Sequence, residues 1–100
     1  MILRLYGKAQ VIHEADAAWN ELFPRFPALP GARQIYDLAI DLVTTSCGFG
    51  VPLYEYQGDR SLLNDWANAK GREGIRTYWE KKNQQSIDGL PTSILEKSRT

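Results

Sequence analysis

The chain has 100 residues, of which 43% are hydrophobic and 24% charged, a composition typical of one globular domain and not of a disordered segment. Twelve basic and twelve acidic residues cancel, which argues against sequence-independent nucleic-acid binding because such binding needs a basic surface. The single cysteine cannot form an internal disulfide, which favours a reducing, cytoplasmic setting. The chain has no apolar run of the roughly 18 residues that span a membrane and no signal-peptide layout. We therefore expect a cytoplasmic protein without nucleic-acid or membrane partners.

Two long segments alternate between apolar and polar residues, as half-buried strands do. The first runs from Ile2 to His13 and the second from Gln34 to Ser46. Gly7 falls on the apolar face of the first strand, where it indicates a bulge or the close approach of another backbone. A short third strand is expected at Leu53–Tyr56.

Helical spacing of apolar residues predicts one helix between the two long strands and two helices after the third strand. The first helix is capped by Asp16 and ends near Pro24, because proline removes a backbone donor. The second is capped by Asp59 or Ser61 and ends at Gly71, and the last helix follows directly.

This order of elements predicts an α+β fold, with an antiparallel sheet of about three strands, one inserted helix and two C-terminal helices. Ser86–Pro91 has the composition of a turn, residues 1–92 form the domain, and residues 93–100 are expected to fray as a polar tail. Both outer edges of such a sheet are open. We therefore expect that the chain has lost part of its sheet or borrows strands from a partner.

The corner between the second and third strands, from Thr44 to Pro52, is the first candidate site. It contains Cys47, the only cysteine, together with two glycines that let a ligand approach the backbone closely. Gly48-Phe49-Gly50 either forms a tight hairpin or presents backbone N–H groups to a flat ligand ring, and it matches no phosphate-binding motif. Cys47 is either a nucleophile or a small buried or ligand-lining residue.

His13 and the pair Arg4 and Lys8 also have two interpretations each. His13 is a strand-end residue or a metal ligand, but one histidine and one cysteine cannot complete a zinc site, so no metal is expected. Arg4 and Lys8 share the polar face of the first strand and either face an anion or are solvated. Arg72 and Arg76 are assigned to a solvated helix face.

Several motifs occur in a fixed order along the chain. They are Ile2-Leu3-Arg4-Leu5-Tyr6-Gly7-Lys8-Ala9, Leu29-Pro30-Gly31-Ala32-Arg33-Gln34, Thr45-Ser46-Cys47-Gly48-Phe49-Gly50-Val51-Pro52, Gly71-Arg72-Glu73-Gly74, and Lys82-Asn83 with Ser86-Ile87-Asp88-Gly89-Leu90-Pro91. In this combination the chain resembles the C-terminal half of the pyridoxamine 5′-phosphate oxidase-like, FMN-binding split-barrel proteins. Within them it is most similar to the branch marked by the Ser-Cys-Gly-Phe-Gly-Val-Pro corner.

The resemblance implies a homodimer in which a partial split β-barrel binds FMN at the subunit interface and acts on an unknown small molecule. It implies that the flavin lies near the corner, lined by Ser46, Cys47, Gly48 and Phe49, with Arg4 close to the cofactor, and it identifies no catalytic residue. It also implies a preceding half-barrel that carries most of the FMN phosphate contacts. The chain is then an FMN-dependent oxidoreductase or its C-terminal part; the alternative is a non-catalytic dimerisation module that does not bind FMN by itself.

Overall fold

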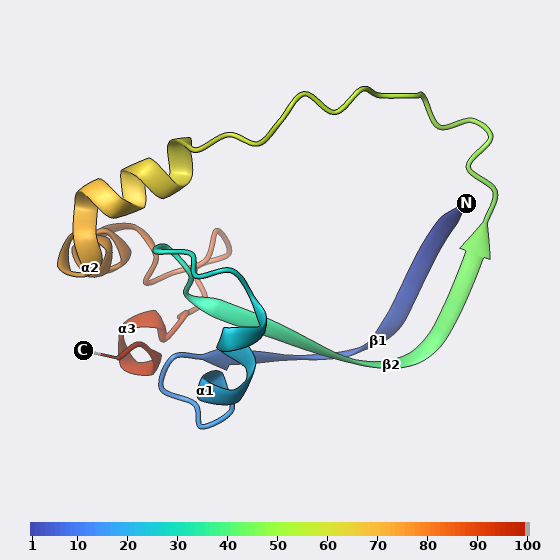
Figure 1. Cartoon of the computed structure of the whole chain (residues 1–100). Coiled ribbons are helices and arrows are strands. Elements are labelled where there is room, and N and C mark those ends of the chain that lie inside the picture. Colours follow the sequence, from blue (N-terminus) through green and yellow to red (C-terminus); the bar gives the residue numbers. More distant parts are fainter. Residues whose placement is uncertain (100) are drawn as a thin grey trace. The chain divides into compact units, whose positions relative to one another are not determined.

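The computed structural model describes residues 1–99 as an α+β chain with a two-stranded sheet and a few helices (Figure 1). The chain divides into two compact units. Unit 1 consists of Met1–Val11 with Tyr36–Asp59, and unit 2 consists of Ile12–Ile35 with the chain from Arg60 onward. Both strands contribute residues to each unit.

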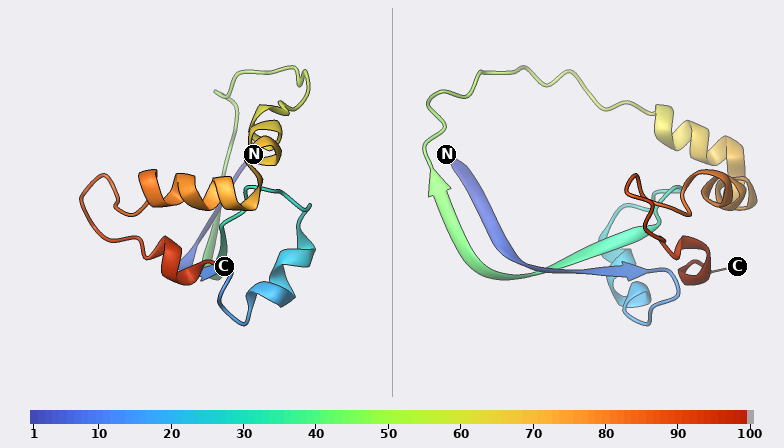
Figure 2. Two further views of the ribbon diagram at one scale, coloured as in Figure 1. Left: turned by 90° about the vertical axis from the view of Figure 1, so that its left-hand side faces the viewer. Right: turned by 180° about the vertical axis from the view of Figure 1, so that it is seen from behind.

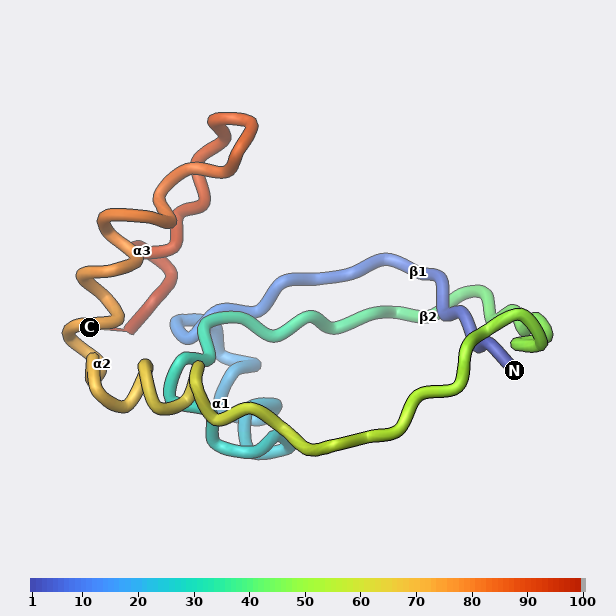
Figure 3. Tube along the Cα trace, turned by 90° about the horizontal axis from the view of Figure 1, so that it is seen from above, coloured from blue at the N-terminus to red at the C-terminus, as the bar shows by residue number. Residues whose placement is uncertain are grey.

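Strands β1 (Ile2–His13) and β2 (Gln34–Ser46) have the bounds that the alternating pattern predicts. They run side by side in opposite directions (Figure 3). The backbones approach closely at Gly7, where an added Cβ would lie only 2.0 Å from the carbonyl oxygen of Ala39. The expected close approach is thus confirmed, since any side chain at this position would push the strands apart.

The expected third strand at Leu53–Tyr56 is not formed in the structure. Residues 52–61 have neither helical nor strand pairing, so the sheet described within 1–99 has two strands and is not closed into a barrel. The physical reason is that alternation alone does not make a strand, which needs the hydrogen bonds of a neighbouring strand. Leu53–Tyr56 is exposed along its whole length and has no such neighbour.

Unit 1 contains no buried residue, although it carries most of the large exposed apolar side chains. Alternation places four of them on one face of β2, namely Tyr36, Leu38, Ile40 and Leu42. Ile40 and Leu42 are each at least half exposed. Burial of apolar surface is the main favourable term in folding, so unit 1 lacks within itself the usual source of stability.

A short helical segment of unit 2 connects the strands. It consists of α1 (Trp19–Leu22) followed by the 3₁₀ helix η1 (Phe23–Arg25), so it ends close to Pro24 as predicted. The expected cap at Asp16 is wrong: Ala18 occupies the cap position, and the Asp16 carboxylate accepts the His13 backbone N–H over 2.7 Å. The carboxylate therefore holds the end of β1 and not the start of the helix.

This connection and the strand ends form a small core within unit 2. Trp19 stacks on Phe23 with ring centroids 4.9 Å apart. The buried members of the cluster are Ile12, Trp19 and Ile35, with Leu22 and Phe23 packed against them. Rings of this size supply much of the apolar contact that a small core needs.

Helix α2 (Leu62–Lys82) begins directly after Ser61 and changes direction at Gly71. The two halves point in clearly different directions (Figure 2). Gly71 has φ 64° and ψ 174°, a conformation that is essentially restricted to glycine. The prediction that Gly71 separates two helical segments is confirmed.

The C-terminal part of unit 2 contains the expected turn and an unexpected helix. Ser86–Pro91 is closed by a bridge between Gln85 and Pro91. Residues 93–99, which we expected to fray, include α3 (Ile94–Lys97), whose Ile94 is buried and which packs on α2. Thr100 lies outside the described residues. Burial of one isoleucine and the contact with α2 account for a helix that a polar sequence alone does not indicate.

Candidate functional site

The corner after β2 forms a tight turn at the surface of unit 1. The Val51 N–H donates a hydrogen bond to the Gly48 carbonyl over 3.0 Å. A Cβ on Gly48 would lie 3.2 Å from the backbone nitrogen of Met1, so the absence of a side chain suits this position. The tight turn that the hairpin interpretation requires is therefore present. The second strand of the hairpin is absent, since residues 52–61 form no strand.

Two of the candidate residues of unit 1 come together beside this turn. The Arg4 guanidinium on β1 donates a hydrogen bond to the Ser46 hydroxyl at the end of β2, with Nη1 and Oγ 2.9 Å apart. The residues are 42 positions apart in the chain, and the antiparallel pairing joins them. This bond uses one of the five N–H donors of the arginine, and Arg4 is exposed, so the guanidinium has donors left for a ligand.

Cys47 and Phe49 lie at the surface of the corner. The Cys47 thiol is exposed, so the interpretation as a small buried residue is wrong, and its ligand-lining role stays a prediction. Phe49 is 97% exposed, so both faces of its ring are open to a partner. An aromatic ring this exposed has almost no packing role inside unit 1.

The extended segment after the corner carries one defined polar contact. The Tyr56 hydroxyl donates a hydrogen bond of 2.6 Å to the Asp59 carboxylate. This hydrogen bond raises the pKa of Tyr56 above its usual value of 10.0, because the neutral phenol donates to an anion, and a little desolvation adds to the effect.

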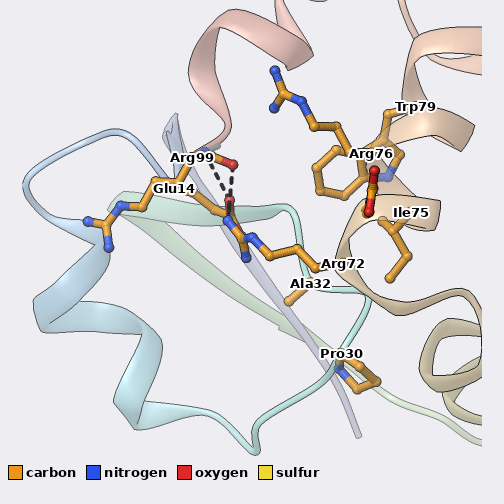
Figure 4. Close-up of a pocket in the computed structure, with 9 residues that line it drawn as sticks. Glu14, Pro30, Ala32, Arg72, Ile75, Arg76, Trp79 and Arg99 are labelled. Atoms are coloured by element: carbon orange, nitrogen blue, oxygen red, sulfur yellow. Dashed lines mark hydrogen bonds and ion pairs between the residues drawn. The ribbon is translucent and has the colours of Figure 1, made fainter.

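A second candidate site lies in unit 2, at a cavity of about 300 Å³ (Figure 4). It is lined by Glu14, Pro30, Ala32, Arg72, Glu73, Ile75, Arg76, Trp79 and Arg99. Most of the charged and aromatic lining comes from the second half of α2, and the close-up shows these side chains projecting from one stretch of the helix. The volume is at the lower end of the range for small-molecule pockets, about 300–1,000 Å³.

Glu14 is the buried acid of this cavity. It is 8% exposed, and its carboxylate accepts hydrogen bonds from Arg72 at 3.0 and 3.4 Å. The backbone N–H of Arg99 donates a further bond of 3.1 Å to the same carboxylate. With an ion pair and a backbone donor, the negative charge of Glu14 is fully compensated inside the protein.

Arg76 lies one turn beyond Arg72 on α2, and its surroundings differ. Its Nη1 donates to the Ser98 hydroxyl over 2.8 Å. None of the three ion pairs found within residues 1–99 involves Arg76, although the residue is half-buried. Ile75, which is buried, and the half-buried Trp79 supply apolar surface in the same cavity.

This cavity is not expected from the sequence, in which Arg72 and Arg76 are assigned to a solvated helix face. The available signal was their spacing: Arg72, Arg76 and Trp79 follow each other at four and three positions, which places them on one helical face. Their partners are remote in the sequence, with Glu14 58 positions before Arg72 and Ser98 22 positions after Arg76. Such contacts are visible only in the folded chain.

His13 is a buried strand-end residue whose Nε2 lies 3.2 Å from Nε2 of Gln34. Across residues 1–99, His, Cys, Asp and Glu side chains form no group of three that could hold a metal ion. None of the helices in this range has the length and apolar content needed to cross a bilayer.

The chain is thus an α+β protein with two candidate ligand-binding surfaces, the corner of unit 1 and the cavity of unit 2. Among curated proteins it is similar to the pyridoxamine 5′-phosphate oxidase family protein ustO of Aspergillus flavus, with 32% identity over 105 residues. The match includes 90% of this chain and 42% of the relative, so the chain spans less than half of the relative's length. No family model matches the chain, and no solved structure does.

This match confirms the resemblance that the motifs indicate. Over 90% of its own length the chain is homologous to a member of the pyridoxamine 5′-phosphate oxidase family.

Proposed function

We propose that this chain forms one wall of an FMN site at the corner of unit 1, as part of a split-barrel oxidoreductase that acts on a small molecule. The observation that carries the proposal is the contact between Arg4 and Ser46, which places a guanidinium and a hydroxyl beside the glycine turn. Homology to this family supports the same cofactor, since members of this family commonly bind FMN.

The residues of the corner have the chemistry that a flavin mononucleotide requires. Arg4 offers N–H donors to an anionic or carbonyl oxygen, and the Ser46 hydroxyl both donates and accepts. Gly48 allows the close approach of a ring to the backbone, and the exposed ring of Phe49 is free to stack. When bound, FMN itself supplies the electron-transfer chemistry, and the protein orients the ring and sets its electrostatic surroundings.

A second candidate function is supported by a different observation. Unit 1 buries no residue and presents an apolar face of β2, which suits a surface made to associate with a second copy of the chain. In that case the chain is a non-catalytic dimerisation module that does not bind FMN alone. In the first function the same face forms the dimer interface next to the flavin.

Titration of FMN with purified protein separates the two functions. If the corner binds flavin, FMN fluorescence is quenched to a saturating level. Arg4→Gln then weakens binding about tenfold or more, because a hydrogen bond from a charged donor is lost. Lys8→Gln is the matched control: it removes one positive charge from the same strand, four residues away, and should leave the affinity unchanged. Free-flavin fluorescence at high protein concentration would instead favour the dimerisation module.

A further inference from the structure

We propose that the cavity of unit 2 binds a small organic anion, with its anionic oxygens on Arg76 and its apolar body against Ile75 and Trp79. This site lies entirely within unit 2, so it does not depend on the FMN site proposed for unit 1. The ligand class is a carboxylate or phosphate joined to a compact apolar group.

The charges around the cavity favour an anion. Of the described residues, three arginines and two glutamates line it, which leaves one positive charge in excess among them. Glu14 is compensated by Arg72 and a backbone N–H, and the Arg99 side chain donates to Asn20 over 3.0 Å. The side chains of Arg76 and Arg99 therefore both have neutral hydrogen-bond partners among residues 1–99, and Arg76 is the one that shares α2 with Ile75 and Trp79.

Arg76 is held in position but not neutralised. Its one hydrogen bond within residues 1–99, to the Ser98 hydroxyl, fixes the side chain and leaves four of its five N–H donors for other partners. The planar fork of a guanidinium matches the two oxygens of a carboxylate or phosphate. A half-buried cation whose protein partner is a neutral hydroxyl gains more from such an anion than a solvated one does, since it has already lost part of its water.

The rest of the cavity limits the ligand to a small molecule with an apolar part. About 300 Å³ accommodates a group the size of a benzene ring with its anionic substituent. Ile75 and Trp79 provide an apolar wall, and Pro30 adds apolar surface from the segment before β2 (Figure 4). Glu73 also lines the cavity, and its carboxylate opposes the binding of an anion.

The test is a titration of the full chain with benzoate and with phenyl phosphate, followed by NMR of the Trp79 indole N–H and the Arg76 side chain. We expect saturable changes in the chemical shifts of both groups. Of benzoate and phenyl phosphate, the probe that binds more tightly identifies the preferred anion. The neutral analogue benzamide has the same ring and should bind at least about tenfold more weakly, because it lacks the charge-assisted hydrogen bonds. Equal shifts with benzamide, or none with either anion, would overturn the proposal.

Variants assign the site to particular residues. Arg76→Gln should weaken anion binding about tenfold or more, while Arg60→Gln, which removes an exposed arginine of unit 2 outside the cavity, should leave it unchanged. Glu73→Gln should strengthen binding, because it removes the opposing charge. Ser98→Ala removes the hydroxyl that positions Arg76 but keeps the cation, so binding should persist. If folded Arg76→Gln binds the anions as tightly as the unaltered chain does, Arg76 is not their ligand and the proposal is wrong.

Discussion

Glu14 shows at the scale of one residue how this chain uses charge. A carboxylate that is 8% exposed needs compensation, and here Arg72 and the backbone of Arg99 provide it. The Arg72 side chain is 63% exposed, so solvent screens part of the ion pair. The contact joins residues 58 positions apart and thus ties the end of β1 to α2 within unit 2.

We predict that Glu14→Gln lowers the free energy of unfolding by about 1–2 kcal/mol, because a buried carboxylate loses charge-assisted hydrogen bonds. Urea denaturation followed by tryptophan fluorescence measures this, since all three tryptophans lie in unit 2. Glu21→Gln is the matched control. Its ion pair with Arg25 is exposed on both sides, so its effect should stay below about 0.5 kcal/mol. Equal effects of the two substitutions would contradict this account of Glu14.

At the scale of an element, α2 is governed by the break at Gly71. The residue divides one helical run into two halves, and the second half carries the arginines and the tryptophan of the cavity. Its dihedral angles lie where a Cβ is strongly disfavoured, although no atom lies within 4 Å of the position that a Cβ would occupy. The constraint is therefore in the backbone and not in the packing.

We predict that Gly71→Ala destabilises the fold by about 1–3 kcal/mol, the usual strain of a non-glycine residue in this region. Thermal unfolding followed by circular dichroism at 222 nm checks it. Gly74→Ala is the control within the same helix: it has no positive φ, and only Lys70 must shift by a few tenths of an ångström, so its effect should be within about 1 kcal/mol. An unchanged melting temperature in Gly71→Ala would mean that α2 adapts without the break.

At the scale of the whole molecule, the distribution of burial is uneven. Every buried residue of the described chain lies in unit 2, and unit 1 exposes apolar side chains along both strands and the corner. A single two-stranded ribbon is marginally stable in water at best. The strands keep their predicted bounds, but they offer an apolar face for which unit 1 contains no cover.

We predict that the protein self-associates through this face of β2. Sedimentation should show a mass that rises with concentration, and Ile40→Glu should give a monomer because it places a charge on the apolar face. Ala39→Glu is the control, since it adds the same charge at the neighbouring position, which alternation puts on the opposite face. A concentration-independent monomer mass for the unaltered chain would contradict the prediction.

The local features of this protein follow from its amino-acid sequence. Alternation predicted β1 and β2 to the residue, a single glycine predicted the break in α2, and the ordered motifs indicated the family. These features depend on nearest neighbours along the chain, such as side-chain period and the φ values that a residue tolerates. The same pattern wrongly predicted a strand at Leu53–Tyr56. Alternating residues form a strand only where a neighbouring strand pairs with them, and this segment has no such neighbour.

Contacts between groups that are distant in the sequence are visible only in the folded chain. The Arg4–Ser46 contact at the corner follows from the pairing of β1 with β2, and the cavity of unit 2 follows from the packing of α2 beside residues far away in the sequence. In the sequence, nothing distinguishes Arg76 from an exposed arginine. In the folded chain it differs by being half-buried and by having a neutral hydroxyl as its partner. The physical reason is that hydrogen bonds and desolvation depend on separation in space, which sequence spacing does not specify for residues on different elements.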